Sequence, residues 1–152
     1  MEIPALNTIF LLWVCLIVPS VLAKPVRYCD KKGNYAIKVK GVELKPDPVK
    51  PGEPAVFNIY ASSGEEISGG HVVIDVSYFG VHVHNEKMDL CQETPCPIAA
   101  GNFVLSHIQT LPKFTPPGSY TLKMQIQDSS DSILTCISFN FKIGFGSSVS
   151  AI

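Results

Sequence analysis

Residues 120–127 read Tyr-Thr-Leu-Lys-Met-Gln-Ile-Gln, and residues 137–143 read Ile-Ser-Phe-Asn-Phe-Lys-Ile. In both stretches apolar and polar side chains alternate one by one, which is the pattern of a β-strand with one buried face. A helix would instead repeat its apolar side chains every three or four positions. The sequence therefore predicts two long strands near the end of the chain, each with one face directed at a core.

Weaker forms of the same alternation occur upstream, and sequences rich in Pro, Gly, Ser and Asp separate them. No apolar stripe of helical spacing extends over ten residues. Six or seven short strands without helices predict an all-β fold, an antiparallel β-sandwich in one domain of about 120 residues. The upstream candidate strands are residues 35–39, 55–59, 72–78 and 103–107, with residues 81–83 as a further short one.

The chain of 152 residues begins with an apolar segment. Its apolar run, Ile9 to Val18, is too short for the ~20 residues that a membrane-spanning helix needs. Val21-Leu22-Ala23 supplies the small residues that a signal peptidase accepts. We therefore expect residues 1–23 to be a secretory signal cleaved after Ala23, and residues 24–152 to form one domain with its core at about 26–144. An uncleaved signal anchor is the alternative.

The charges of the remaining chain are balanced. Loss of Glu2 from the 13 acidic residues would leave 12, against 12 basic residues. Like charges form no run longer than a pair such as Lys31-Lys32. Proteins that bind nucleic acid need a basic stripe to neutralise phosphates, so we expect no nucleic-acid partner.

Four cysteines would remain after the loss of Cys15: Cys29, Cys91, Cys96 and Cys136. An even number in a secreted chain indicates two disulfides, with three possible connectivities. The close pair at 91 and 96 can form a small loop, which would leave the other two cysteines to meet. A zinc site of four thiolates is the competing interpretation, but such sites usually take their ligands as two close pairs and the sequence has one.

Two histidines, His82 and His84, alternate with valines and are expected on one face of an extended segment, roughly 6.6–7 Å apart. Metal sites use that spacing. A third ligand would have to come from Asp89, His71 or His107, and the sequence places none of them nearby. A solvent-exposed face explains the pair equally well, so no metal is expected. Protonation of the pair would make binding sensitive to pH.

Catalytic motifs are absent from the sequence. It contains no Gly-x-Ser-x-Gly, no His-Glu-x-x-His and no phosphate-binding glycine loop. Asp128 and Asp131 lie in a polar turn, where solvation and turn hydrogen bonds are the default. We expect a protein that is not an enzyme and needs no cofactor.

Several motifs together resemble the ML family, the MD-2-related lipid-recognition family. This family includes the lysosomal sterol carrier of Niemann-Pick type C2 disease, fungal phosphatidylglycerol/phosphatidylinositol transfer proteins and plant homologues. The likeness covers about residues 26–144 and looks closest to the phospholipid-transfer and plant branch, so we expect a plant member of the family. The motifs are Asp89-Leu-Cys91, Cys96-Pro-Ile98 with Gly101, Leu111-Pro112, Pro117-Gly118-Ser-Tyr-Thr-Leu122 and Leu134-Thr-Cys136.

The resemblance implies an immunoglobulin-like sandwich whose two sheets separate to hold a lipid, and it implies the disulfides Cys29–Cys136 and Cys91–Cys96. A packed core would explain the same large inner side chains; the resemblance favours the cavity. The expected lipid-binding residues are Phe57, Ile59, Ile74, Val76, Tyr78, Leu105, Phe114, Leu122, Met124, Ile126, Phe139 and Phe141.

Two features distinguish this chain from the sterol-carrying animal members that it resembles. Those members have a third disulfide, and no cysteine lies between Cys29 and Cys91 here. The segment after Leu111-Pro112, which is apolar and aromatic in them, here contains Lys113, and Pro117 replaces an aromatic ring. An anionic head group near Lys113 is therefore our hypothesis.

The function implied is a lipid-binding and transfer protein that shields a sterol or a phospholipid acyl chain and exchanges it with membranes by transient contact. The expected location is the secretory pathway, with the extracellular space or apoplast, the vacuole or the endomembrane lumen as end points. The alternative is a secreted interaction module or co-receptor that binds a protein partner, with lipid regulatory or incidental.

Overall fold

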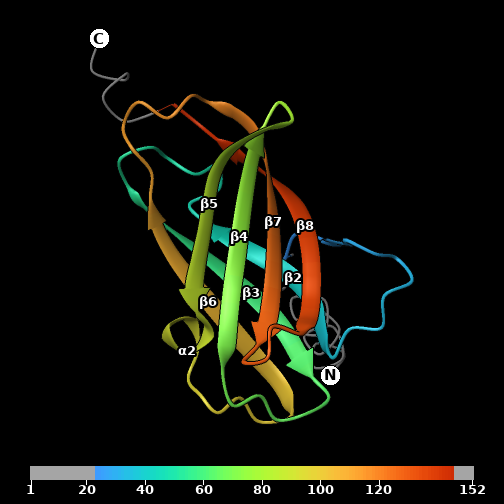
Figure 1. Cartoon of the computed structure of the whole chain (residues 1–152). Helices are drawn as coiled ribbons and strands as arrows, with labels where there is room; N and C mark the ends of the chain where they lie inside the picture. Colours follow the sequence, from blue (N-terminus) through green and yellow to red (C-terminus); the bar gives the residue numbers. More distant parts are fainter. Residues whose placement is uncertain (1–22, 146–152) are drawn as a thin grey trace, which may run out of the picture.

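Figure 1 shows the computed structural model of the chain, which describes residues 23–145. Residues 1–22, which hold nearly all of the expected signal segment, lie outside the described residues, so cleavage after Ala23 stays a prediction. Within the described part, no helix is long and apolar enough to cross a membrane. The elements are β1 (Arg27–Tyr28), β2 (Ile37–Lys45), β3 (Pro54–Ser63), β4 (Gly70–Tyr78), β5 (Val81–Asp89), α2 (Leu90–Glu93), β6 (Gly101–Thr110), β7 (Gly118–Asp128) and β8 (Ile133–Ile143).

The strands form two sheets, and neighbouring strands in each are antiparallel. One sheet has the order β1-β8-β7-β4-β5, and the other has the order β2-β3-β6. Figure 1 shows the second sheet running obliquely behind the first. Buried apolar side chains of both sheets belong to one core cluster. The prediction of an all-β antiparallel sandwich is confirmed.

Three elements differ from the sequence expectation. β1 has two residues, too few to display an alternation, and it pairs with β8 beside the Cys29–Cys136 disulfide. β5 extends to Asp89 although most of its side chains are exposed, because it is an edge strand with little to bury. α2 is a single turn, capped where the Asp89 side chain accepts a hydrogen bond from the Cys91 backbone N–H at 2.8 Å. One turn is too short to display a helical stripe.

The core lies between the sheets, and side chains fill it at the end away from the β4–β5 turn. In the register of β4 with β7, Val72 lies opposite Ile126 and Ile74 lies opposite Met124, all of them buried. Both disulfides that the resemblance implies are present: Cys29–Cys136 joins the segment after β1 to β8, and Cys91–Cys96 closes the loop that contains α2. This part of the interior is filled by side chains.

Gly70 begins β4 at a close approach to the backbone of β7. Its φ is +153°, and a Cβ there would collide with the carbonyl oxygen of Gln127. We expect Gly70→Ala to lower the free energy of unfolding by at least about 2 kcal/mol, because the two backbones would have to separate. Gly80→Ala is the matched control, since Gly80 also has a positive φ but an added Cβ would meet nothing within 4 Å. That change should cost about 1 kcal/mol. Equal losses of unfolding free energy in the two variants, measured by urea unfolding, would contradict the role assigned to the contact between Gly70 and the backbone of β7.

Candidate functional site

A cavity of about 540 Å³ lies between the two sheets at the end where the β4–β5 hairpin and the segment 111–117 meet. Its volume is in the range of about 300–1,000 Å³ that ligand sites occupy. Most of the wall is apolar. The lining residues are Phe57, Ile74, Val76, Tyr78, Val83, His84, Glu86, His107, Gln109, Thr110, Leu111, Pro112, Phe114, Thr115, Pro116, Tyr120, Leu122, Phe141 and Ile143.

A row of aromatic rings crosses the cavity wall from one sheet to the other. Tyr78 of β4 stacks on Tyr120 of β7 with ring centroids 4.4 Å apart, and Tyr120 stacks on Phe141 of β8 at 5.8 Å. Phe141 meets Phe57 of β3 edge to face at 5.7 Å. Such ring pairs add to the stabilisation that burial provides, so the packed rings hold this part of the apolar wall in place.

Two tyrosine hydroxyls hold the segment 111–117 over this end of the cavity. The Tyr120 hydroxyl donates a hydrogen bond to the carbonyl oxygen of Pro116 at 2.8 Å, and the Tyr78 hydroxyl donates to that of Pro117 at 3.1 Å. Burial, and secondarily the nearby Tyr78, raises the pKa of Tyr120, which keeps its hydroxyl protonated as a donor. Phe114, at the tip of the segment, is 86% exposed.

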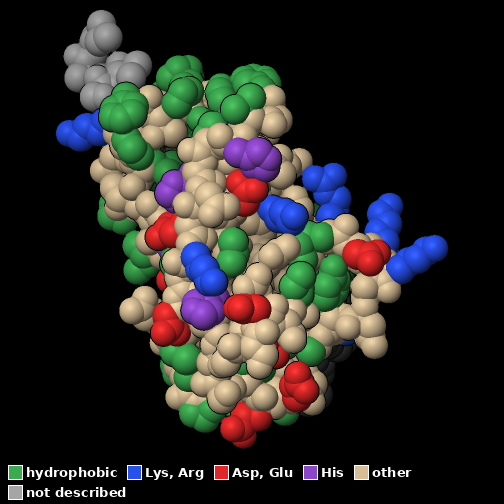
Figure 2. Space-filling model, viewed as in Figure 1, with side chains coloured by type: hydrophobic (Ala, Val, Ile, Leu, Met, Phe, Trp, Pro, Cys, Tyr) green, Lys and Arg blue, Asp and Glu red, His purple; other side chains and the backbone are tan. Residues whose placement is uncertain are grey.

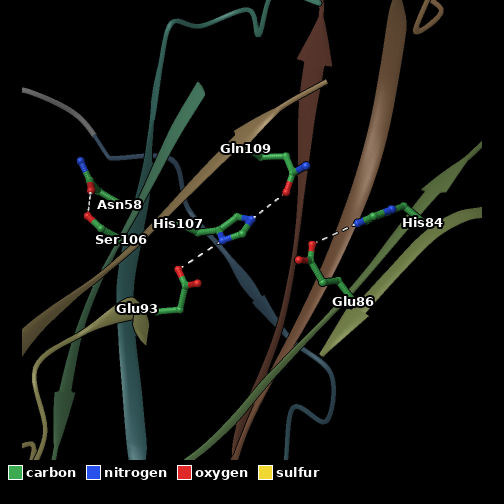
Figure 3. A network of polar contacts seen from close by, with 7 residues as sticks. All are labelled: Asn58, His84, Glu86, Glu93, Ser106, His107 and Gln109. Carbon is green, nitrogen blue, oxygen red and sulfur yellow. Dashed lines mark hydrogen bonds and ion pairs between the residues drawn. The ribbon is translucent and has the colours of Figure 1, made fainter. Parts of the chain in front are cut away.

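The polar part of the wall lies on the facing edge strands β5 and β6 (Figure 3). His107 of β6 is 8% exposed; its Nδ1 lies 3.2 Å from Glu93 Oε2 and its Nε2 lies 3.1 Å from Gln109 Oε1. On β5, His84 Nε2 lies 3.2 Å from Glu86 Oε2. Each imidazole in the wall therefore has a carboxylate beside it, and no Lys or Arg is among the described residues that line the cavity.

The expectation that His82 and His84 share a face is wrong. A β-bulge shifts the register of β4 with β5, so that Val76 pairs with His84 but Ser77 pairs with His82. His84 faces the cavity, whereas His82 lies on the outer face with its Nδ1 2.9 Å from Asp75 Oδ1. Within residues 23–145 no group of three or more His, Cys, Asp or Glu side chains could hold a metal ion.

The twelve expected lipid-binding residues occupy two regions of the interior. Seven line the cavity: Phe57, Ile74, Val76, Tyr78, Phe114, Leu122 and Phe141. The other five lie in the filled core and are not part of the cavity wall: Ile59, Leu105, Met124, Ile126 and Phe139. Lys113 is exposed beside Phe114 and outside the wall, against Gly52. Whether any of these side chains contacts a lipid stays a prediction.

Several wall residues were not expected from the sequence. Tyr120 and Ile143 stand on the apolar faces of predicted strands, so the alternation had the signal for them. From the sequence, His107 is a candidate metal ligand and His84 a candidate metal ligand or pH-sensitive group, and neither is placed on a cavity wall. Gln109 and Glu86 carry no sequence signal, because polar residues on edge strands are usual. Their position on the wall depends on how far the two sheets separate, which no local pattern encodes.

Two proteins with assigned names are similar to this chain in sequence. A protein of Dictyostelium discoideum named as a phosphatidylglycerol/phosphatidylinositol transfer protein is 30% identical over 139 residues, which cover 88% of this chain and 96% of that one. The phosphatidylglycerol/phosphatidylinositol transfer protein of Aspergillus oryzae is 29% identical over 119 residues, covering 74% and 68% of the two chains. These relatives give no support to the expected plant origin.

Two solved structures share the fold. A Niemann-Pick type C2 protein from the Japanese carpenter ant matches with a TM-score of 0.63 at 15% identity, covering 79% of this chain and 99% of that one. Chicken MD-1, complexed with lipid IVa, matches with a TM-score of 0.50 at 19% identity, covering 77% and 86%.

The sequence also matches a family directly. The profile of the ML domain fits residues 23–143, nearly the whole of the described part. Its relatives are lipid-binding and lipid-transfer proteins rather than enzymes, in agreement with the absence of catalytic motifs. The two-sheet sandwich, the cavity between the sheets and this match together establish that the chain is a member of the ML domain family.

Proposed function

We propose that this protein carries one phospholipid with its acyl chain in the cavity and exchanges it with membranes. The observation that carries the proposal is an apolar cavity, lined by packed aromatic rings, that is open at one end of the sandwich. Each CH₂ group removed from water gains ~0.8 kcal/mol. A bilayer offers nearly the same gain, so exchange between protein and membrane is close to balanced and the lipid can be released again.

The proposed head-group position is outside the wall, near Lys113. This lysine is exposed on the segment that covers the cavity end, whereas the wall itself carries carboxylates beside its histidines. An anionic phosphate is favoured next to a cation in water and is disfavoured beside carboxylates in an enclosed site. The names of the relatives in Dictyostelium and Aspergillus, which refer to two anionic phospholipids, support this choice.

Native mass spectrometry of the secreted protein, followed by organic extraction, tests the proposal. The expected result is one lipid per chain, identified as a phospholipid in the extract, and transfer of phosphatidylglycerol or phosphatidylinositol between vesicles. A sterol in the extract would overturn the phospholipid assignment. A protein of bare mass that transfers no lipid would overturn the carrier and favour the interaction module.

The proposed membrane contact uses the tip of the β4–β5 hairpin. Phe79 is 85% exposed, and it stands with Gly80 in a two-residue turn where both φ values are positive, 51° and 78°. Such turns favour Asn-Gly, because a bulky side chain at positive φ is strained. An exposed aromatic ring kept at a strained position points to a function outside folding. Phe114 is exposed at the same end, where apolar side chains gather in Figure 2.

We expect Phe79→Asn to slow lipid transfer between vesicles about tenfold, because the turn keeps a favoured residue while the membrane contact loses a ring whose burial gains about 1.5–3 kcal/mol. Phe79 does not line the cavity, so the amount of lipid bound to the protein in solution should stay the same. Ile133→Asn is the control: Ile133 is half exposed as the first residue of β8, where it pairs with Gln127 at the opposite end of the sheet from Phe79. Equal transfer rates for wild type and Phe79→Asn would contradict the hairpin contact.

The proposed location is the secretory pathway. Two disulfides in a chain of this size are typical of oxidising compartments, and the expected signal segment supports the same route. The compartment in which the protein finally acts would follow from imaging the untagged chain with an antibody. Retention in the cytosol with reduced cysteines would contradict the proposal.

A further inference from the structure

We infer that Gln109 selects the polar group of the bound lipid, and that a proton held between His107 and Glu93 sets whether Gln109 offers the cavity a hydrogen-bond donor or an acceptor. The inference rests on the proposed carrier function and deepens it.

The His107–Glu93 pair is enclosed. The two side chains are 10% and 13% exposed, and Glu93 stands on α2 inside the loop closed by the Cys91–Cys96 disulfide. The neighbouring group from β3 is the uncharged ring of Phe57, with centroids 6.4 Å apart. From β5, the titratable wall residues are His84 and Glu86, which pair with each other. A change of charge in such a site is felt more strongly than one in water.

The hydrogen-bond geometry links the orientation of the Gln109 amide to the proton count. Gln109 Oε1 lies 3.1 Å from Nε2 of His107, and a carbonyl oxygen only accepts, so in this orientation of the amide Nε2 carries a hydrogen. Nδ1 faces Glu93 Oε2, and that contact also needs a proton, on either the ring or the carboxyl group. The ring and the carboxyl group therefore hold two protons together. In this state the NH₂ group of Gln109 is turned away from the ring (Figure 3), and Gln109 is part of the cavity wall.

Loss of one proton reverses the amide. The proton between the ring and Glu93 stays, because a bare carboxylate facing a bare ring nitrogen has no hydrogen to share. Nε2 then becomes an acceptor, and only the NH₂ group of Gln109 can satisfy it. The side-chain amide must turn over, and its carbonyl oxygen replaces the NH₂ group in the cavity wall.

The two states prefer different ligands. With two protons on the pair, the wall offers an N–H to a group that only accepts, such as the ester carbonyl of an acyl chain. With one proton, the wall offers an oxygen, which favours a hydroxyl. The group bound here is uncharged, because Glu86 lines the same cavity, Glu93 pairs with His107, and no Lys or Arg is among the described residues of the cavity wall. The ester of a glycerolipid is therefore the ligand group that we assign to the doubly protonated state.

Two uncharged lipids with the same chain length test the inference in the full protein. Methyl palmitate carries an ester that only accepts, whereas hexadecanol carries a hydroxyl that both donates and accepts, and neither titrates. Displacement of the hydrocarbon probe diphenylhexatriene measures both affinities at about pH 5 and about pH 8, between which histidines change charge. The readout is the ratio of the two affinities, in which changes of the whole cavity cancel. We expect the ratio of ester to alcohol affinity to fall about fivefold at the higher pH, the worth of one net hydrogen bond.

Single-residue variants show which side chain causes the pH dependence of the affinity ratio. Gln109→Leu, at a half-buried position, should make the ratio independent of pH while the hydrocarbon probe still binds, and His107→Gln should do the same. His84→Gln and His82→Gln should both keep the pH dependence; His82 is the matched control, since it forms a histidine–carboxylate pair on the outer face with Asp75.

The possible results distinguish the roles of His107, Glu93 and Gln109 from the proposed carrier function. A wild-type ratio that does not change with pH would overturn the role of the His107–Glu93 proton. A pH-dependent ratio that survives in Gln109→Leu would overturn the role of Gln109, and one that is lost in His84→Gln would move the effect to β5. If neither lipid nor the hydrocarbon probe binds wild type, the proposed function fails, and the inference fails with it.

Discussion

A Val76→Trp variant is expected to bind lipid roughly fiftyfold more weakly than wild type while keeping its fold. Val76 lies on the cavity wall near the end of β4, opposite Leu122 of β7 and His84 of β5. An indole there would occupy the space of roughly three methylene groups of the ligand. At ~0.8 kcal/mol per CH₂ the loss is about 2.5 kcal/mol. Displacement of a fluorescent hydrocarbon measures it.

Val73→Trp is the matched control for this prediction. Val73 stands on the same strand but outside the cavity wall, between the outward-facing Lys87 and Gln125 of the neighbouring strands. Its replacement should leave the affinity within about twofold of wild type. The same affinity in both Trp variants, with unfolding midpoints unchanged, would show that lipid does not occupy the cavity.

Removal of the Cys29–Cys136 disulfide is expected to cost about 4.7 kcal/mol of unfolding free energy, as a Cys29→Ala/Cys136→Ala double variant. The bridge spans a sequence separation of 107, and its chain-entropy contribution grows with the loop it closes. Much of the 5–15 kcal/mol that a domain of this size possesses would be lost. Guanidinium unfolding of the oxidised wild type and of the variant measures the difference.

The Cys91–Cys96 bridge provides the comparison for the long disulfide. It has a sequence separation of 5, and its removal should cost about 2 kcal/mol. We also expect the loss of this bridge to change the pH dependence of lipid binding, because the loop that it closes carries Glu93. Of the two disulfides, it should have the smaller effect on the stability of the fold. Equal losses of stability from the two double variants would contradict the loop-length argument.

The sequence was sufficient for the sandwich because alternation assigns each side chain to a face. Tyr120, Leu122, Met124 and Ile126 stand on one face of β7, as predicted, and all four are buried. Alternation does not tell which residues of the buried face line the cavity and which lie in the filled core. Tyr120 and Leu122 reach the cavity, whereas Met124 and Ile126 lie in the filled core. That division depends on where the two sheets separate, a property of the assembled layers.

The bulge in β5 marks a second limit. A single extra residue places His82 outside and His84 inside, and no turn or glycine signals it in the sequence. The polar wall depends on the same kind of information, because Glu93 reaches His107 only through a one-turn helix held by a short disulfide loop. Local patterns therefore predict the strands and the candidate residues, while pairing between strands determines which side chains meet.

The closed half of the interior, around Ile126 and Ile137, has a consequence for how the protein can change over evolutionary time. Side chains of the filled core and side chains that line the cavity occupy successive levels of the same strands. A substitution at Leu122 or Phe141 would also disturb the filled core, because Leu122 lies opposite Phe139 in the sheet register and the rings of Phe141 and Phe139 are 6.4 Å apart. Effects become independent only beyond about 7–10 Å. The cavity can therefore change at least cost to the fold at its exposed rim, where Phe114 lies.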